Sequence, residues 1–351
     1  MERLVAENID NLDPYTPGEQ PRSADVVKLN TNENPYPPSP KCAEALRGFD
    51  PARLRRYPDP VFLALRKKIA RIHRTSPERV FVGNGSDEIL ALAAKAFSWE
   101  GRKIGSLDPS YSLYKTIAAI RGVEWTGDPG DKAVSLFLWT NPNAPTGRFA
   151  EPGEIAAFAK RFKGVVVVDE AYADFAKGDA MKLATAPGNR NIIVMRTFSK
   201  SYSLAGLRVG YCVGPEKLVE ALFKIKDSYN VDALAQAVAL AALSDRAWMK
   251  ANAAKIRRTR RVFSKELALR GWDVIPSEAN FVFAKPPAGS SAADVYAALR
   301  KRGIFTRYFP GPSTGDRLRI SIGTDGEMSK LLLALDSETK SVRQKRERTR
   351  Q

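Results

Sequence analysis

Short apolar runs alternate along the chain with stretches that repeat apolar residues every three or four positions. The first pattern is typical of a buried strand and the second of an amphipathic helix, so the alternation predicts an α/β fold with a mainly parallel sheet covered on both faces. The expected strands are 80–82, 135–139, 165–168 and 192–195, and the expected helices are 89–97 and 151–162. A long helical stretch then covers about 215–269. A second, smaller α+β unit is expected from strand 281–283, helix 292–302 and strand 318–322.

The length of 351 residues exceeds what one hydrophobic core usually supports. We therefore expect an N-terminal segment 1–40 that covers the site with the small domain, a large domain 41–256 and a small domain 257–336. The end of the chain, 337–351, holds six Lys or Arg and two Glu without apolar periodicity. Its composition predicts a basic, disordered tail.

Each expected strand of the large domain ends at a polar motif that favours a turn. The motifs are Gly83-Asn-Gly-Ser-Asp-Glu88, Asn141-Pro-Asn-Ala-Pro-Thr-Gly147, Asp169-Glu-Ala-Tyr172 and Thr197-Phe-Ser-Lys200. Ligands of open α/β sheets bind at the carboxyl ends of strands, so these motifs are expected to meet in one crevice. The first motif precedes a helix and offers backbone N–H groups to an anion, although such turns are equally often only turns.

Lys200 is the residue with the most informative neighbours. A lysine amine is a nucleophile in its neutral form and makes an imine with a carbonyl compound. Ser199 and Arg208 can both bind one phosphate. Asp169 ends a buried strand, so it requires a cationic or hydrogen-bonding partner, which is either a protonated ring nitrogen or the next element of the fold. Tyr172 either points into the same crevice or is structural.

Composition narrows the class of protein. The net charge of +17 indicates an anionic partner, which is either a phosphorylated metabolite or nucleic acid. The chain has only two cysteines and one histidine, which excludes a disulfide framework and a zinc site built on Cys and His. His73 is expected on the solvated face of a basic helix. No apolar stretch is long enough to span a bilayer or resembles a signal peptide, which favours a cytoplasmic protein.

Taken in order, these motifs closely resemble those of the fold-type I pyridoxal-phosphate (PLP) aminotransferases, and among them the histidinol-phosphate aminotransferase family. The resemblance runs from residue 8 to about residue 335. Besides the strand-end motifs, the matching pieces are Asp13-Pro-Tyr15, Leu29-Asn-Thr-Asn-Glu-Asn-Pro35, Tyr57-Pro-Asp-Pro60, Gly206-Leu-Arg208 and Leu318-Arg-Ile-Ser-Ile-Gly-Thr324.

The resemblance implies a role for each matching residue. Lys200 would carry the cofactor as a Schiff base and then act as the proton-transfer base, Asp169 would pair with the pyridine nitrogen, Tyr172 would bond the ring oxygen O3′, and Tyr111 would stack on the ring. The residues implied to bind the cofactor phosphate are Gly85, Ser86, Asp87, Ser199, Arg208 and, from a second subunit, Tyr57. The last contact implies a homodimer.

One position departs from the family pattern. The family usually has Asn immediately before Pro-Thr-Gly to bond O3′, whereas this chain has Ala144 there and Asn143 one residue earlier. Either Asn143 turns into the site or Tyr172 bonds O3′ with less help.

The implied substrates depend on two arginines. Arg319 resembles the family's α-carboxylate ligand, and Arg307 matches the position that binds the distal phosphate or carboxylate. Tyr15 and Asn34 are implied to border the same pocket. The implied reaction moves an amino group from histidinol phosphate to 2-oxoglutarate, which leaves as glutamate.

Three alternatives remain. Threonine-phosphate decarboxylase and aromatic amino acid aminotransferase share the scaffold. A nucleic-acid-binding protein on an inactive transferase scaffold is a third, disfavoured because Lys200, Asp169 and Arg208 are all present. We therefore expect small-molecule substrates and no metal, membrane or nucleic acid as partner.

Overall fold

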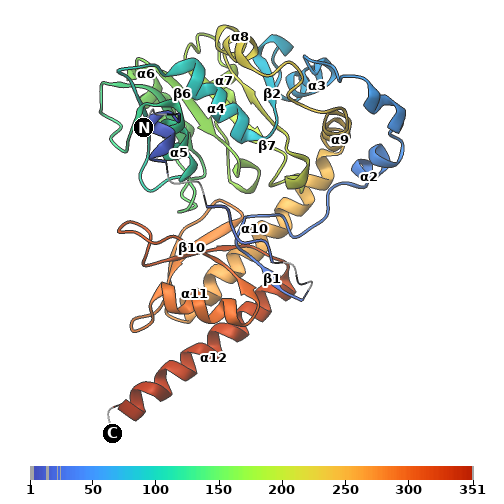
Figure 1. The fold of residues 1–351 in the computed structure, drawn as a ribbon. Helices are drawn as coiled ribbons and strands as arrows, with labels where there is room; N and C mark the ends of the chain where they lie inside the picture. The colour runs from blue at the N-terminus through green and yellow to red at the C-terminus, as the bar shows by residue number, and fades with distance from the viewer. Residues whose placement is uncertain (1–3, 13–15, 22, 24, 350–351) are drawn as a thin grey trace.

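The computed structural model describes residues 4–12, 16–21, 23 and 25–349, with the backbone alone in 338–349. The chain folds into two packed units that helix α10 (Arg246–Leu269) connects (Figure 1). Each unit has its own buried hydrophobic core. This arrangement leaves an interface between the units in which a site can be built from both.

The large unit is organised around a seven-stranded sheet of order β2-β8-β7-β6-β5-β3-β4. All neighbours pair in parallel except β8, which is antiparallel to both β2 and β7. The prediction of a mainly parallel sheet is therefore confirmed. The strands are β2 (Val80–Gly83), β3 (Lys103–Ser106), β4 (Glu124–Thr126), β5 (Val134–Thr140), β6 (Val165–Asp169), β7 (Ile192–Thr197) and β8 (Gly210–Val213).

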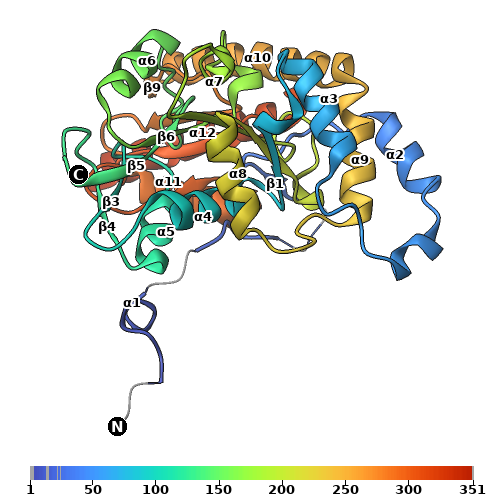
Figure 2. The same cartoon turned by 90° about the horizontal axis from the view of Figure 1, so that it is seen from above.

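Helices cover both faces of this sheet (Figure 2). On one face α4 (Ser86–Phe97) packs against α5 (Leu113–Arg121) and α8 (Glu216–Ile225). The opposite face carries α6 (Pro152–Arg161) and α7 (Met181–Thr185). A third group joins α2 (Pro40–Arg47) and α3 (Leu63–His73) to α9 (Ala233–Leu243). The short 3-10 helices are η1 (Pro51–Arg55), η2 (Pro77–Arg79), η3 (Ala173–Phe175) and η4 (Ala205–Leu207).

The second unit contains a four-stranded antiparallel sheet of order β12-β13-β10-β9. Its strands are β9 (Asp273–Ile275), β10 (Phe281–Lys285), β12 (Arg307–Tyr308) and β13 (Leu318–Ser321), with helices α11 (Ala292–Lys301) and α12 (Asp325–Thr349). Near the N-terminus, β1 (Val27–Lys28) pairs in parallel with β11 (Ile304–Phe305). Helix α1 (Glu7–Asp10) instead lies against α5 of the large unit.

Two details differ from the domain limits expected from the sequence. On α10, Met249 packs in the first core whereas Ala253 and Ile256 pack in the second, so the change of core precedes the expected boundary at 256/257. Helix α12 continues to Thr349 through the segment predicted to be a disordered tail. That segment contains no Gly or Pro and is rich in Lys, Arg, Glu and Gln, which favour helix.

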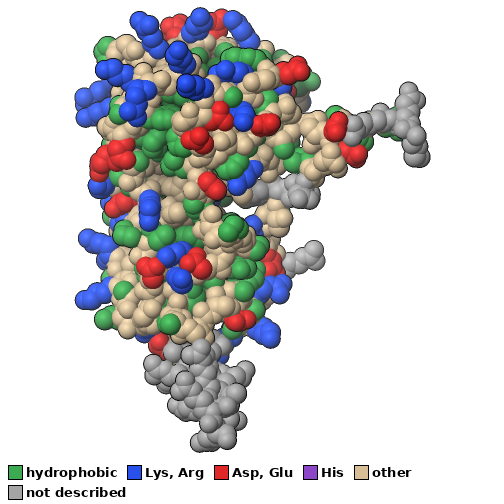
Figure 3. Space-filling view, turned by 90° about the vertical axis from the view of Figure 1, so that its left-hand side faces the viewer, with side chains coloured by type: hydrophobic (Ala, Val, Ile, Leu, Met, Phe, Trp, Pro, Cys, Tyr) green, Lys and Arg blue, Asp and Glu red, His purple; other side chains and the backbone are tan. Residues whose placement is uncertain are grey.

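Basic and acidic side chains are interspersed over both units on the face that Figure 3 shows. Within the described ranges, no helix is long and apolar enough to cross a membrane. The same residues include no group of three or more His, Cys, Asp and Glu side chains placed to hold a metal ion.

Candidate active site

A cavity of about 630 Å³ lies between the two units, a size typical of small-molecule sites. Thr140, Asp169 and Thr197, which end the central strands β5, β6 and β7, line its floor. Arg307 and Arg319 line it from the second unit. The crevice at the carboxyl ends of the strands therefore exists as expected, and the second unit contributes two of its cations.

Lys200 follows β7 and points its amine into this cavity. Nζ donates a hydrogen bond to the backbone oxygen of Thr31 at 3.0 Å. Burial lowers the pKa of the Lys200 amine to about 8, and the positive charge of Arg319 acts in the same direction. A larger fraction of neutral, nucleophilic amine is therefore present near neutral pH than for an exposed lysine.

Asp169, at the end of β6, is buried and faces the same cavity. Burial raises the pKa of this carboxyl from 3.8 to about 6, while hydrogen bonds from the Tyr114 hydroxyl (2.9 Å) and the Ala171 amide (3.1 Å) oppose the rise. A buried carboxyl with a raised pKa gains from a cation placed beside it. Tyr114 of α5 was missed by sequence reasoning, although it lies only three residues after Tyr111, which precedes the helix.

The start of α4 and the Arg208 side chain form a cradle for an anion. The Arg208 guanidinium lies 3.4 Å from Ser199 Oγ and 3.3 Å from Asp87 Oδ2. Gly85 precedes the helix with a φ of +82°, and a Cβ there would lie only 2.7 Å from Arg208 Nη2. Ser86 begins the helix and lines the cavity. Backbone N–H groups, a hydroxyl and a guanidinium therefore converge where a phosphate fits.

Two tyrosines predicted for the ring site also line the cavity. Tyr111 packs edge-on to Tyr114 with ring centroids 5.6 Å apart. Tyr172 lies near the Lys200 amine, which is 5.9 Å from the centre of its ring. Its hydroxyl accepts a hydrogen bond of 3.0 Å from the side chain of Asn32, a residue that sequence reasoning did not select.

Asn143 does not take the place that Ala144 leaves. Ala144 lines the cavity, whereas the carboxamide oxygen of Asn143 accepts from the Thr146 hydroxyl at 3.0 Å. The Asn143 backbone is also fixed on both sides, because its N–H donates to the Arg148 oxygen and its own oxygen accepts from Gly147. Its amide nitrogen donates to the hydroxyl of Ser110, a residue of the cavity wall, at 3.5 Å. The side chain therefore stabilises the turn beside the cavity, and its contact with the cofactor stays a prediction.

The two arginines of the second unit are held by backbone oxygens of the N-terminal segment. Arg307 donates to the oxygens of Thr16 (2.7 Å) and Pro17 (3.1 Å), and Arg319 donates to Asn30 (2.9 Å). Arg319 also lies over the ring of Phe309, 5.1 Å from its centroid. A guanidinium carries five N–H donors in a planar fork, a geometry that suits an anion.

Two other predicted residues do not line the cavity. Tyr57 is 78% exposed, stacks on Tyr229 and does not line the cavity of its own chain. Asn34 donates to the backbone oxygens of Lys200 and Ser201, both at 3.2 Å, so it positions the Lys200 loop and is not part of the cavity wall. Tyr15 lies outside the described residues.

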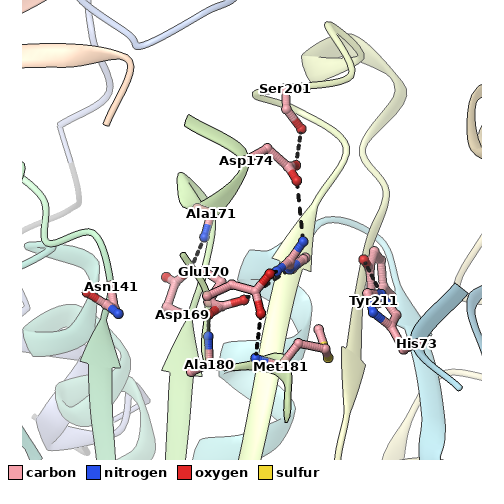
Figure 4. A network of polar contacts seen from close by, with 12 residues as sticks. His73, Asn141, Asp169, Glu170, Ala171, Asp174, Ala180, Met181, Ser201 and Tyr211 are labelled. Carbon is pink, nitrogen blue, oxygen red and sulfur yellow. Dashed lines mark hydrogen bonds and ion pairs between the residues drawn. The ribbon is translucent and has the colours of Figure 1, made fainter. Parts of the chain in front are cut away.

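A buried charge network lies beside the site (Figure 4). Arg196 donates to Glu170 Oε2 at 2.8 Å and to Asp174 Oδ1 at 3.3 Å, and Asp174 accepts from the Ser201 hydroxyl. Glu170 and Ser201 directly follow Asp169 and Lys200 in the chain. The network therefore ties together the two loops that carry the cavity's acid and base.

His73, expected on a solvated face, packs instead against the core. Its Nε2 lies 2.9 Å from the hydroxyl of Tyr211, a residue of β8. Burial lowers the pKa of the imidazole to about 3, and the nearby charge of Arg196 acts in the same direction. The expectation was wrong because His73 ends α3 on the side that faces the sheet.

Comparisons with known proteins identify the family of the chain. The family described as aminotransferase class I and II matches residues 24–335. Histidinol-phosphate aminotransferase 2 of Rhizobium meliloti is 46% identical over 96% of this chain and 99% of its own, and histidinol-phosphate aminotransferase of Syntrophotalea carbinolica is 46% identical over 94% and 98%.

Solved structures give the same result. The crystal structure of histidinol-phosphate aminotransferase from Sinorhizobium meliloti in complex with pyridoxal-5′-phosphate aligns with a TM-score of 0.87 and 26% identity, over 97% of this chain and 99% of that one. L-threonine-O-3-phosphate decarboxylase from Porphyromonas gingivalis aligns at 0.78 over 90% of this chain and 100% of that one; at 22% identity it supports the fold alone. The chain thus belongs to the class I and II aminotransferases of fold type I and, within them, to the PLP-dependent histidinol-phosphate aminotransferase family.

Proposed function

We propose that this protein transfers the amino group of histidinol phosphate to 2-oxoglutarate, as a step of histidine biosynthesis. One observation carries the proposal: two cations of the second unit, Arg307 and Arg319, line the same cavity as the Lys200 amine. The names of relatives that are 43 to 46% identical over almost the whole chain support it.

The residues of the cavity fit PLP. The cradle of Gly85, Ser86, Ser199 and Arg208 would hold its phosphate. Glycine at position 85 lets the Arg208 guanidinium approach the backbone there, because a Cβ would lie only 2.7 Å from Nη2. Asp169 would face its ring nitrogen, where a positive charge offsets the burial of the carboxylate. When bound, the cofactor supplies an electron sink for the electrons of a broken Cα–H bond.

Lys200 would attach the cofactor and then serve as the base. Its pKa of about 8 leaves the amine partly neutral at physiological pH, so Nζ can take the proton from the substrate Cα. In the second half of the reaction the same amine returns a proton to the Cα of the product glutamate. Tyr111 and Tyr172 would hold the ring plane and its oxygen.

The two arginines would select substrates that carry anions. Histidinol phosphate has a phosphate and no α-carboxylate, whereas 2-oxoglutarate has two carboxylates. Arg319 would bind the α-carboxylate of the keto acid, and Arg307 would bind the phosphate of one substrate and the distal carboxylate of the other. The planar guanidinium suits both anions because its N–H groups pair with two oxygens at once.

The active form proposed is a cytoplasmic homodimer in which Tyr57 reaches the cofactor phosphate of the partner subunit. Tyr57 is 78% exposed and lies in a stretch that also exposes Leu54 (58%) and Val61 (41%). Exposed apolar residues grouped in this way are typical of an interface. Both cysteines, Cys42 and Cys212, are free, which suits a reducing compartment. Nucleic acid is not a proposed partner.

A half-reaction with each candidate donor tests the proposal. The PLP-loaded protein is mixed with histidinol phosphate, tyrosine or threonine phosphate in the absence of keto acid, and the cofactor spectrum is followed. Conversion to the amine form with histidinol phosphate is expected, with Lys200→Ala as the inactive control. Conversion with tyrosine alone, or release of carbon dioxide from threonine phosphate, would refute the proposed substrate while leaving the family unaffected.

A further inference from the structure

Asn32 is a buried polar residue of the cavity wall for which the proposed reaction has no role so far. It is 1% exposed and has a φ of +55°, in the left-handed region that few residues other than glycine and asparagine adopt. It lies in the segment between β1 and α2, which contacts both units. Its side chain is therefore held in place by its surroundings and is not a flexible surface group.

The hydrogen bonds around Asn32 fix which end of its amide faces Tyr172. The backbone N–H of Asn32 donates to Ser321 Oγ at 2.9 Å. The Ser321 hydroxyl in turn donates to the side-chain oxygen Oδ1 of Asn32 at 3.0 Å. The amide oxygen is thus occupied by a donor, and Nδ2 is left to donate to Tyr172 Oη at 3.0 Å. The tyrosine oxygen is consequently the acceptor in this contact.

A phenol whose oxygen accepts a hydrogen bond is a stronger donor through its own proton, because hydrogen bonds in a chain polarise one another. The chain runs from β13 of the second unit, through Asn32, to a tyrosine of the large unit. The family usually has an asparagine amide at the position of Ala144. In this chain Asn143 does not line the cavity and so does not replace that amide.

We propose that Asn32 is a positioning residue that orients and polarises Tyr172 as a hydrogen-bond donor to the cofactor oxygen O3′, and thereby compensates for the amide missing at Ala144. The inference rests on the role proposed above for Tyr172. Asn32 acts through the tyrosine and makes no contact with the reacting atoms.

The expected consequence has a definite sign. The nitrogen that joins Lys200 to the cofactor and the oxygen O3′ share one proton. A stronger hydrogen bond from Tyr172 stabilises the O3′ anion that remains when this proton is lost, so it lowers the pKa of the nitrogen. The charged groups that face Lys200 are Arg319, Glu33, Asp87 and Arg208, and the buried acid of the site is Asp169. All of them remain in the variants below, so differences between variants report the tyrosine.

The decisive measurement is the apparent pKa of the visible absorption of the PLP-loaded protein. Asn32→Gly removes the amide and keeps a residue that tolerates the positive φ. We expect its apparent pKa to rise by about half a pH unit, the size of one modest hydrogen bond. Tyr172→Phe should raise it further in the same direction, and the double variant should match Tyr172→Phe alone. Adding Ala144→Asn to Asn32→Gly should lower it again.

Asn280→Ala serves as the matched control. Asn280 is buried and donates to the backbone oxygen of Asn32 at 2.9 Å without touching Tyr172. We expect a lower melting temperature and an unchanged apparent pKa, which separates general loosening from the effect on the tyrosine.

Three results would overturn the inference. In the first, Asn32→Gly leaves the apparent pKa unchanged while Tyr172→Phe raises it, and the proposed role of Tyr172 survives. In the second, Tyr172→Phe has no effect, and the roles proposed for both residues are then wrong. A shift in Asn32→Gly that persists in full on the Tyr172→Phe background also counts against it, because Asn32 would then act by another route.

Discussion

The hydrogen bond from Tyr114 lowers the pKa of Asp169, the buried acid of the cavity, and Tyr114→Phe tests this directly. The substitution keeps the ring, so it creates no cavity, and removes the hydroxyl that donates to Asp169 Oδ2 at 2.9 Å. A hydrogen bond to a charged group contributes about 1.5 to 3 kcal/mol, which corresponds to about one to two pH units. Because this bond stabilises the carboxylate, its loss should raise the pKa of Asp169 from about 6 to the range above neutrality.

The consequence is a pH-dependent loss of cofactor affinity. Only the ionised Asp169 pairs with a protonated ring nitrogen, so affinity falls about tenfold for each pH unit below the pKa of the acid. In the variant the affinity for PLP begins to fall at a pH about one to two units higher than in the wild type. Binding is therefore about two- to tenfold weaker than in the wild type at pH 7 and hardly weaker at pH 9. Titration of the apoprotein with PLP between pH 6 and pH 9 measures this.

The matched control is Tyr211→Phe, which removes another buried hydroxyl, one that contacts His73 and not Asp169. Its cofactor affinity should follow the wild-type pH curve. If Tyr114→Phe also followed the wild-type curve, or lost affinity equally at every pH, the assignment of Tyr114 as the group that lowers the pKa of Asp169 would be refuted.

Three further predictions concern other parts of the site. Arg196→Met should lower the free energy of unfolding by about 3 to 5 kcal/mol in urea titrations, because it leaves the buried Glu170 without its cation. The loss should be largest at high pH and shrink as the pH falls toward about 7, because Arg196 lowers the pKa of Glu170 and without it the carboxyl takes up a proton at a higher pH. Gly85→Ala should weaken PLP binding at least about tenfold through the close contact with Arg208, whereas Gly188→Ala, with a similar φ but no atom within 4 Å of the added Cβ, should cost only about 1 kcal/mol of stability and leave binding unchanged. Arg307→Lys should raise KM about tenfold or more for both substrates with little change in kcat, since a lysine cannot pair with two oxygens of one anion.

The sequence predicted the fold and the location of those site residues that belong to a local motif. Lys200, Asp169 and Arg208 each lie beside a strand end or a glycine, so their position follows from local pattern and from the rule that ligands bind at the carboxyl ends of strands. The strands β3 and β8 were missed because they are short and include glycines. Close packing requires the glycine of β8, because a Cβ at Gly210 would lie 2.7 Å from the backbone nitrogen of Ser86.

What the sequence could not predict are the residues that act on other side chains. Asn32 reaches Tyr172 across 140 positions and Tyr114 reaches Asp169 across 55, so no local pattern contains either pair. The partners of Asn143, the Thr146 hydroxyl and the Ser110 hydroxyl, likewise depend on the shape of an irregular turn. Contacts between distant elements depend on how the two units pack, and this packing is visible only in the structure.

The two principal ionisable groups of the cavity are both shifted toward their neutral forms. Burial raises the pKa of Asp169 to about 6 and lowers that of Lys200 to about 8, so each carries its charge with less solvation than in water. A ligand that brings a cation to Asp169, a carbonyl carbon to Lys200 and an anion to Arg208 stabilises the site at three points. These shifted pKa values favour a zwitterionic ligand such as PLP, and this gives a physical reason for the three residues to lie in one cavity.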